Sequence, residues 1–422
     1  MIELTLKADP NCQDDSDPSS LPIDVARIKI LDDIQPVTEV ESLPLMEGLN
    51  RILAKDLFAT IDVPPSANSA MDGYAIDSVD IPKDGTAELT VIGTVWAGKP
   101  YAGKVTSGTC VRIMTGGVIP VGADTVVMQE NIQIIDKKII IDTRTSKGDN
   151  LRRAGEDFSK GDCIITASTL LTPAHLGIIA SLGIGSMVVF RKIRVAYFLT
   201  GDELCSIGNP LENGKIYDSN RYSLFGMLSS PAIEIIDLGI VKDTQLAIEQ
   251  AMKISENNSD VLITTGGVSV GDADFVKDVL EKRGEIKFWK VAMKPGRPLA
   301  FGKLDNTIFF GLPGNPVSAT VTFYQFVLPA LKHLMGNKDL SMPTFNVICQ
   351  SILKKHPGRV EYQRGILSRN KSGEMVVTKT GAQGSGILSS MTAANCFIIL
   401  PLENDGVMAG ETVEVQPFFG LM

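Results

Sequence analysis

The fold is decided by residues 264–275, which read Thr-Thr-Gly-Gly-Val-Ser-Val-Gly-Asp-Ala-Asp-Phe. This glycine-rich loop follows a short apolar run, Val261 to Thr265, that predicts a buried strand, and it leads into a predicted helix from Asp274 to Arg283. The alternation continues on both sides, with strands predicted at 194–200, 233–241 and 307–312 and helices at 222–229, 244–257 and 316–336. Residues 191–340 therefore indicate a doubly wound α/β domain with a mostly parallel sheet.

Two other strands of this region end in loops of similar character. One loop reads Leu-Thr-Gly-Asp-Glu-Leu over residues 199–204, and the other reads Gly-Leu-Pro-Gly-Asn-Pro-Val-Ser-Ala over residues 311–319. Any one of the three loops alone is equally well explained as a tight turn. Together they lie at the carboxyl ends of parallel strands, the sheet edge where ligands bind, and their glycines let the backbone approach a phosphate. None matches the dinucleotide-binding or P-loop patterns. We expect a phosphate-bearing substrate to contact Gly266, Gly267, Ser269, Gly314 and Asn315.

Charged residues of both signs accompany these loops. The carboxylate oxygens that Mg²⁺ prefers are supplied by Glu203, Asp272 and Asp274. Positive charge for an oxyanion is supplied by Lys290, Lys294 and Arg297, although lysines of this kind are more often solvated surface residues. Two unit charges about 4 Å apart interact by roughly 4 kcal/mol near a protein surface, against roughly 1 kcal/mol in water. The combination therefore favours metal-assisted phosphoanhydride chemistry.

The rest of the chain lacks this regular alternation of predicted strands and helices. Residues 1–21 are polar and predict a flexible leader. Residues 22–61 and 158–190 are mixed, with helices expected at Asp24–Asp33 and Leu45–Ala54 and, later, a helix with Thr172 as its cap and Pro173 at its first position. Between these two segments, residues 62–157 contain short β-rich runs at 88–95, 109–114 and 124–129, which predict an inserted β domain. Residues 341–422 predict a second β domain.

Composition excludes several classes of protein. The chain has 422 residues and a net charge of -9, which argues against nucleic-acid binding because that needs a basic face. Its six cysteines form no CxxC pair, and its three histidines are scattered, so neither a disulfide framework nor a histidine metal centre is expected. The uncharged segment 163–190 is interrupted by Pro173 and glycines and does not predict a membrane helix. We expect a cytoplasmic protein that binds no membrane.

Three loops of the inserted β domain are unusual for hairpins. They read Asn-Ser-Ala-Met-Asp-Gly-Tyr-Ala over 68–75, Met-Thr-Gly-Gly over 114–117 and Leu-Arg-Arg-Ala-Gly-Glu-Asp over 151–157. Each alone is equally compatible with ordinary turn chemistry. Seven motifs nevertheless occur in one order along the chain: NSAMDGYA, MTGG followed by Pro-x-Gly-Ala-Asp, RRAGED, TGDEL, TTGGVSVGDADF, KPGRPLAFG and LPGNPVSA.

In this order the motifs resemble the molybdopterin molybdenumtransferase family, which includes the bacterial MoeA enzymes and the gephyrin E domain. The resemblance covers about residues 22 to 420. The sequence departs from the family at Ser66-Ala67, where Phe-Asp is common, and at Cys396, where glycine is usual. The first departure affects local loop packing, and the second places a thiol in the last β domain.

The resemblance implies a multidomain α/β fold. An elongated helical domain carries the inserted β domain and is followed by the α/β domain and a C-terminal β-barrel-like domain. It also implies a homodimer whose active site lies between protomers, and a reaction in which adenylyl-molybdopterin and molybdate give molybdenum cofactor and AMP with Mg²⁺. The resemblance places catalytic residues at Asp72, Thr115, Glu203, Asp274, Lys290 and Lys294, with Glu203, Asp243 and Asp274 as metal ligands. Further substrate contacts are implied at Arg152, Asp157, Pro313, Pro316, Arg364 and Ser385.

Other functions are compatible with parts of this pattern. The adenylyltransferase that makes the substrate also has an α/β fold with a Thr-Gly-Gly loop, but the additional domains and the Asp272-Ala273-Asp274 continuation favour the insertion step. A gephyrin-like scaffold role and a contact with the upstream adenylyltransferase are further alternatives. Molybdate and tungstate are both compatible with the cationic residues.

Overall fold

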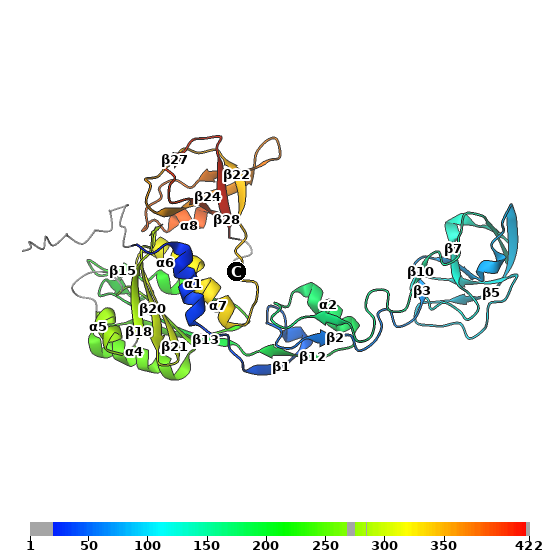
Figure 1. Cartoon of the computed structure of the whole chain (residues 1–422), viewed down its shortest axis with the longest axis horizontal. Helices are drawn as coiled ribbons and strands as arrows, with labels where there is room; N and C mark the ends of the chain where they lie inside the picture. Colours follow the sequence, from blue (N-terminus) through cyan, green and yellow to red (C-terminus); the bar gives the residue numbers. More distant parts are fainter. Residues whose placement is uncertain (1–19, 268–274, 284, 419–422) are drawn as a thin grey trace, which may run out of the picture.

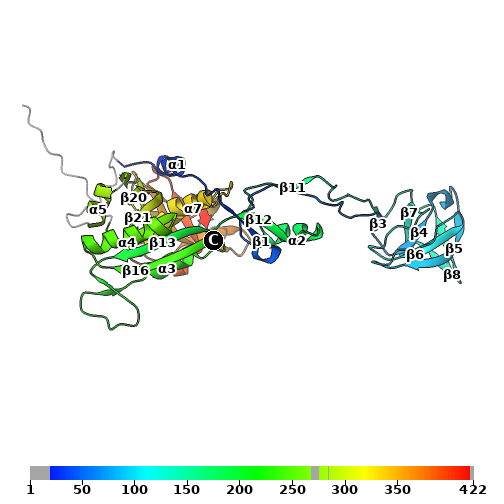
Figure 2. The ribbon, with the colours of Figure 1, turned by 90° about the horizontal axis from the view of Figure 1, so that it is seen from below.

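A computed structural model describes residues 20–267, 275–283 and 285–418 of the chain. The molecule is elongated (Figure 1). Two domains form a head at one end, a narrow neck follows, and a small β domain lies at the other end. The view turned by 90° shows the same separation (Figure 2). Within the described residues, no helix is long and apolar enough to cross a membrane.

The larger half of the head is built on a six-stranded sheet in the order β16-β13-β17-β21-β20-β18. The first four strands are parallel, and β20 is antiparallel to both of its neighbours, β21 and β18, so β18 runs in the same direction as the first four. The expectation of a mostly parallel sheet is confirmed. The expected strands at 233–241, 261–265 and 307–312 have the bounds that the sequence predicted, but β18 and β20 were not expected. The bounds are β13 (Ile193–Thr200), β16 (Ile233–Val241), β17 (Val261–Thr265), β18 (Glu285–Lys290), β20 (Pro298–Leu304) and β21 (Thr307–Leu312).

Helices cover both faces of this sheet because the central strands are apolar on both sides. On β13, Tyr197 packs with the helices of one face, whereas Phe198 packs with those of the other. The first face carries α1 (Ile23–Asp33), α3 (Asn220–Leu228), α6 (Pro316–Thr322) and α7 (Leu328–Leu334), and the second carries α4 (Gln245–Asn258) and α5 (Phe275–Arg283). These helices confirm the doubly wound α/β architecture.

The helix predicted from Pro316 to Gly336 contains a π-helical segment, η4 (Phe323–Val327), between α6 and α7. Pro329 has no backbone N–H for the carbonyl of Gln325, four residues earlier. Arg27 of α1 donates from Nε to that carbonyl at 3.3 Å. The first helix of the chain therefore satisfies a polar group inside a helix that lies about 300 positions later in the sequence.

The neck is held together by two strand pairs. Strand β1 (Val40–Pro44) pairs with β12 (Ser186–Phe190), and β2 (Leu57–Phe58) pairs with β11 (Cys163–Ile165). Helix α2 (Pro173–Ser181) begins as predicted, with Thr172 and His175 forming a capping box. The predicted helix at Leu45–Ala54 is wrong.

Only a 3₁₀ turn, η1 (Leu45–Glu47), forms in that segment. Asn50 adopts a positive φ of 59°, which a helix does not accommodate, and Ile52 and Leu53 pair instead with residues of the returning chain. The apolar side chains of Ile52 and Leu53 are buried in the neck by this pairing. The hydrophobic pattern of the segment therefore reflects burial in the neck and not one face of a helix.

The remote β domain is a six-stranded sheet in the order β7-β4-β6-β5-β9-β8. Apolar side chains on its two faces form two separate small cores, one around Tyr74 and Ile76 and the other around Ala75 and Val126. The strands are β3 (Asn68–Ser69), β4 (Gly73–Ile76), β5 (Thr86–Val95), β6 (Thr109–Ile113), β7 (Thr125–Met128), β8 (Gln133–Ile135), β9 (Lys138–Asp142) and β10 (Leu151–Arg152), with 3₁₀ turns η2 (Ser78–Asp80) and η3 (Gln129–Asn131).

The second half of the head confirms the expected β-barrel. Strand β24 pairs with both β25 and β26, which closes a ring in the order β24-β25-β22-β28-β26. Cys396 lies in its core, and a Cβ on Gly365 would come within 2.9 Å of the Cys396 Sγ, so the sulfur fills space beside that glycine. Burial raises the pKa of this thiol to about 12. The elements are β22 (Phe345–Cys349), β23 (Leu353–Lys354), β24 (Val360–Arg369), β25 (Met375–Lys379), α8 (Ser389–Ala393), β26 (Cys396–Leu400), β27 (Gly406–Val407) and β28 (Thr412–Pro417).

Candidate functional site

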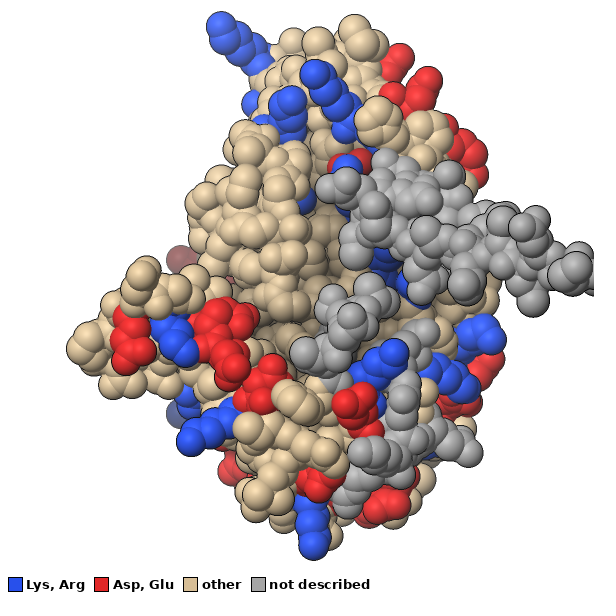
Figure 3. All heavy atoms as spheres, turned by 90° about the vertical axis from the view of Figure 1, so that its left-hand side faces the viewer, with Lys and Arg blue, Asp and Glu red and all other residues tan. Residues whose placement is uncertain are grey.

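A cavity of about 500 Å³ lies where the α/β domain meets the barrel. The space-filling view shows the molecule hollowed between these two domains, with Lys and Arg side chains in the hollow (Figure 3). The residues that line the cavity come from the loops after β17 and β21, the connection between β18 and β20, and strand β24 with the loop after β25. Nine residues predicted from the sequence meet here: Gly266, Gly267, Lys294, Arg297, Pro313, Gly314, Asn315, Arg364 and Ser385.

Two glycine loops form one wall of the cavity. Gly266 has a φ of 85°, and a Cβ at this position would lie 2.4 Å from the carbonyl oxygen of Thr200, so only glycine fits without movement of the backbone. The Cα of Gly266 would lie 3.8 Å from a Cβ on Gly314, which brings the two loops into contact. Asn220, the first residue of α3, donates from Nδ2 to the Gly314 carbonyl at 2.7 Å and to Thr265 Oγ1 at 3.4 Å. Its amide therefore ties both loops to the same helix.

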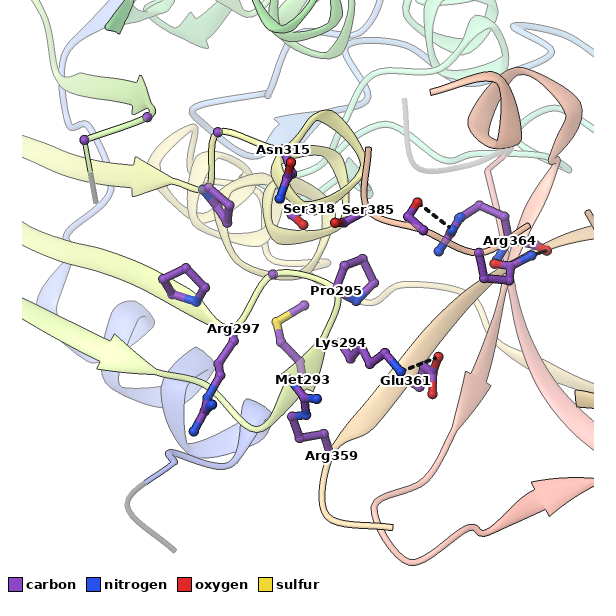
Figure 4. Close-up of a pocket in the computed structure, with 18 residues that line it drawn as sticks. Met293, Lys294, Pro295, Arg297, Asn315, Ser318, Arg359, Glu361, Arg364 and Ser385 are labelled. Carbon is purple, nitrogen blue, oxygen red and sulfur yellow. Dashed lines mark hydrogen bonds and ion pairs between the residues drawn. The ribbon is translucent and has the colours of Figure 1, made fainter. Parts of the chain in front are cut away.

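The facing wall is cationic. Arg297, Arg359 and Arg364 are buried residues that line the cavity, and the Lys294 side chain is 46% exposed (Figure 4). Arg364 donates from Nε to Ser390 Oγ at 3.1 Å and from Nη2 to the Gly384 carbonyl at 3.2 Å. Burial lowers the pKa of the Arg364 guanidinium to about 10, a value at which it still carries its charge at neutral pH.

Loop residues of the barrel complete this wall. The carbonyl of Ser385 accepts a hydrogen bond from the backbone N–H of Val317 at 3.1 Å, which joins the barrel to the beginning of α6. Gln383 accepts from the backbone N–H of Arg364 at 2.8 Å. The hydrogen bond between Val317 and Ser385 thus links the α/β domain directly to the barrel at the cavity.

Several lining residues were not expected from the sequence, namely Ser318, Arg359, Glu361 and Gln383. A signal was present around β24, where Arg359 directly precedes the strand and Glu361 and Arg364 are charged residues within it. Their significance depends on the pairing of β19 (Met293–Lys294) with β24, a contact between two domains.

Other predicted residues lie outside the cavity lining. Lys290 is at the end of β18, where its carbonyl accepts from Leu21, and Pro316 is the first residue of α6. Glu203 and Asp243 follow the neighbouring strands β13 and β16 at the same sheet edge. Ser269, Asp272 and Asp274 lie outside the described residues.

The carboxylates after β13 and β16 influence one another. Thr200 donates from Oγ1 to Asp243 Oδ1 at 3.3 Å. Burial, with added repulsion from Asp202 and Glu203, raises the pKa of the Asp243 carboxyl. A cation would relieve this repulsion, which fits the donor chemistry of Mg²⁺. The described part of the chain holds no set of three His, Cys, Asp or Glu side chains suited to a metal.

The predicted residues of the remote β domain form two groups of their own. Asp72 Oδ1 accepts a hydrogen bond from the backbone N–H of Thr115 at 2.8 Å, which joins the NSAMDGYA and MTGG loops. Arg152 and Asp157 line a separate, open depression of about 470 Å³ together with Asn68. Both groups lie across the neck from the head cavity (Figures 1 and 2).

Comparisons with known proteins match the chain almost from end to end. Residues 21–183 match the model of the MoeA N-terminal region (domains I and II), residues 196–333 a probable molybdopterin binding domain, and residues 346–418 the MoeA C-terminal region (domain IV). A molybdopterin molybdenumtransferase of Haemophilus influenzae is 45% identical over 95% of this chain and 100% of its own. The chain belongs to the molybdopterin molybdenumtransferase family.

Further relatives agree with this assignment. A Bacillus subtilis protein named molybdopterin molybdenumtransferase is 34% identical over 94% of this chain and 93% of its own. The crystal structure of a molybdopterin biosynthesis MoeA protein from Pyrococcus horikoshii is 31% identical, with a TM-score of 0.82 over 94% of this chain and 100% of that chain. Family and multidomain fold are thus as the motifs indicated.

Proposed function

We propose that this protein is a molybdopterin molybdenumtransferase, which inserts molybdate into adenylyl-molybdopterin and releases AMP. The observation that carries the proposal is the cavity between the α/β domain and the barrel, where glycine loops face a wall of cations. Relatives matched over nearly all of their length carry this name, which supports insertion over the earlier adenylylation step and over a purely scaffolding role.

The two walls suit the two substrates. The loops around Gly266 and Gly314 present backbone to the phosphoanhydride, because neither has a side chain to hold it away. Lys294 and Arg364 supply positive charge for molybdate in a cavity where water screens less than at the surface. The net charge of -9 makes this local positive charge necessary, since the overall field does not attract an anion.

Mg²⁺ belongs to the proposal as the ion that neutralises the phosphoanhydride. Glu203 and Asp243 would hold it, with Asp274 as the third ligand that the family resemblance implies. The repulsion that raises the pKa of Asp243 supports a cation beside these carboxylates. Lys290, at the end of β18, would add charge near the same edge of the sheet.

A homodimer completes the proposal. Asp72 and Thr115 are bonded to each other, yet they lie across the neck from the cavity of their own chain. In a symmetric dimer the remote β domain of one copy would reach the head of the other. Asp72 and Thr115 of the first copy would then lie at the cavity of the second. Arg152 and Asp157 would then contact substrate from the same side. We expect this enzyme to act in the cytoplasm.

Reconstitution with purified components tests the function. Adenylyl-molybdopterin, molybdate and Mg²⁺ are incubated with the protein, and AMP and protein-bound molybdenum are measured together. We expect equal amounts of both products, and tungstate in place of molybdate reports the preferred anion. If molybdopterin and ATP instead give adenylylated product while adenylyl-molybdopterin is left unchanged, the earlier step is the correct one.

A further inference from the structure

One acidic side chain lies among the cations of the cavity. Glu361 is 7% exposed, and its Oε1 lies 3.5 Å from Lys294 Nζ (Figure 4). Strand β19 pairs with β24 so that Lys294 stands directly opposite Glu361, and the ion pair therefore crosses from the α/β domain to the barrel. A buried carboxylate in a cavity for an anion opposes binding, because the two negative charges repel.

The charge of Glu361 reaches beyond Lys294. It also acts on Arg364, where it opposes the lowering of the guanidinium pKa by burial. Two of the cations that line the cavity, Lys294 and Arg364, thus share one internal counter-anion. Lys294 is the member that can exchange partners, since its side chain is 46% exposed, whereas Arg364 is 1% exposed and is bonded to Ser390 and Gly384.

Two roles for Glu361 predict opposite effects of removing its charge. If the carboxylate only holds Lys294 in place, its loss frees the lysine and weakens oxyanion binding. If it competes with the oxyanion for Lys294, its loss removes a repulsive charge and strengthens binding. Two like charges about 4 Å apart near a protein surface repel by roughly twice what the rotamer entropy of one lysine is worth. We therefore expect the second effect to dominate.

We propose that Glu361 is an internal competitor that an incoming tetrahedral oxyanion displaces from Lys294. The carboxylate holds Lys294 at the lining of the cavity and limits the affinity for any oxyanion that enters. It is a positioning residue that acts through Lys294. The inference rests on the proposed function, because it requires the oxyanion to bind in this cavity.

Titration calorimetry with molybdate, and with sulfate as a second tetrahedral anion, tests whether removing the charge of Glu361 strengthens or weakens oxyanion binding. Glu361→Gln is nearly isosteric and should tighten the binding of both anions by about tenfold or more. Glu374→Gln removes the same charge at the exposed tip of the hairpin between β24 and β25 and should match the unmodified protein. In a Lys294→Ala background the effect of Glu361→Gln should become smaller, since the contested cation is gone.

Equal or weaker anion binding by folded Glu361→Gln overturns the proposal. The unmodified protein provides a second test if that variant does not fold. A crystal structure with tungstate should show Lys294 Nζ on the oxyanion and away from Glu361, and a retained Lys294–Glu361 contact beside a bound anion contradicts displacement. If the unmodified protein binds no oxyanion in this cavity, the proposed function fails with it. If it binds and only the variant gives the wrong sign, the proposed function stands without the competitor.

Discussion

The head and the remote β domain each contain a Lys–Glu ion pair, and the two pairs differ in what surrounds them. Lys138 and Glu88 face each other at 2.9 Å across β9 and β5, with side chains 54% and 60% exposed. Lys294 and Glu361 are farther apart, at 3.5 Å, but Glu361 is buried between two domains and its pair lines a cavity with three arginines. Exposed pairs contribute about 0–1 kcal/mol. We therefore expect the reaction to involve the Lys294–Glu361 pair in the cavity, where several charged side chains meet, and not the shorter but exposed Lys138–Glu88 pair.

The largest expected effect comes from removing one lysine of each pair. Lys294→Ala should raise the molybdate KM by about 10–100-fold, since 1.4 kcal/mol of lost interaction corresponds to a factor of ten. Lys138→Ala should leave the KM unchanged, because that lysine lies on an exposed strand pair. Molybdate titrations at two salt concentrations measure both, and the loss should be greater at low salt because screening is weaker there. Unchanged molybdate use by Lys294→Ala contradicts the cationic wall.

The two glycine loops of the cavity provide a comparison within the head. Gly266→Ala should lower the free energy of unfolding by about 1–3 kcal/mol, because it forces a side chain into a left-handed backbone and against the Thr200 carbonyl. Gly314→Ala should cost less than about 1 kcal/mol, since a Cβ there meets nothing closer than 3.8 Å. Urea unfolding curves compare the two. Equal destabilisation would show that the strain does not reside at Gly266.

The smallest expected effect concerns Asp243, the carboxyl whose pKa is raised by burial and by Asp202 and Glu203. A raised folded-state pKa means that the folded protein binds this proton more tightly than the unfolded chain, so ionisation of Asp243 costs stability as the pH rises. Without Mg²⁺, Asp243→Asn should therefore stabilise the protein slightly at neutral pH, by about 0.5 kcal/mol, and this gain should vanish in acid.

Mg²⁺ should reverse that difference, because the metal requires the ionised carboxylate. Thermal unfolding with and without Mg²⁺ follows both effects across roughly pH 4 to 8, the range in which a perturbed carboxyl titrates. The Mg²⁺-dependent gain of the unmodified protein should fall as the pH falls through the raised pKa of Asp243. An equal Mg²⁺ gain in Asp243→Asn removes this residue from the metal site.

The sequence predicted best where one structural element carried its own signal. Strands β16, β17 and β21 are continuous apolar runs bounded by turn residues, and their ends were placed correctly. The motif loops at Gly266 and Gly314 were placed at one edge of the sheet because parallel strands fix that edge. The helix expected at Leu45–Ala54 failed because its apolar residues are buried by pairing across the neck, which no local pattern distinguishes from a helix face.

Glu361 and Arg359 could not be selected from sequence for a related reason. They reach the cavity because β24 pairs with β19 of the other domain, which places Glu361 opposite Lys294. The local sequence carries no signal of this long-range contact. Arg364 and Ser385 were expected only through the family resemblance. The packing of Cys396 against Gly365 likewise depends on closure of the barrel.

Mixing two inactive variants tests most directly whether the remote β domain of one copy serves the cavity of another. Asp72→Ala removes the acceptor that bonds Thr115 in the β domain, and Lys294→Ala alters the cavity. At a molybdate concentration well below the raised KM of Lys294→Ala, each protein alone should form little cofactor. If the site is shared, a mixed dimer contains one intact site, and an equal mixture should recover roughly a quarter of the normal rate. No recovery from a mixture in which mixed dimers are demonstrated, or a protein that is monomeric and fully active, would contradict a site built from two copies.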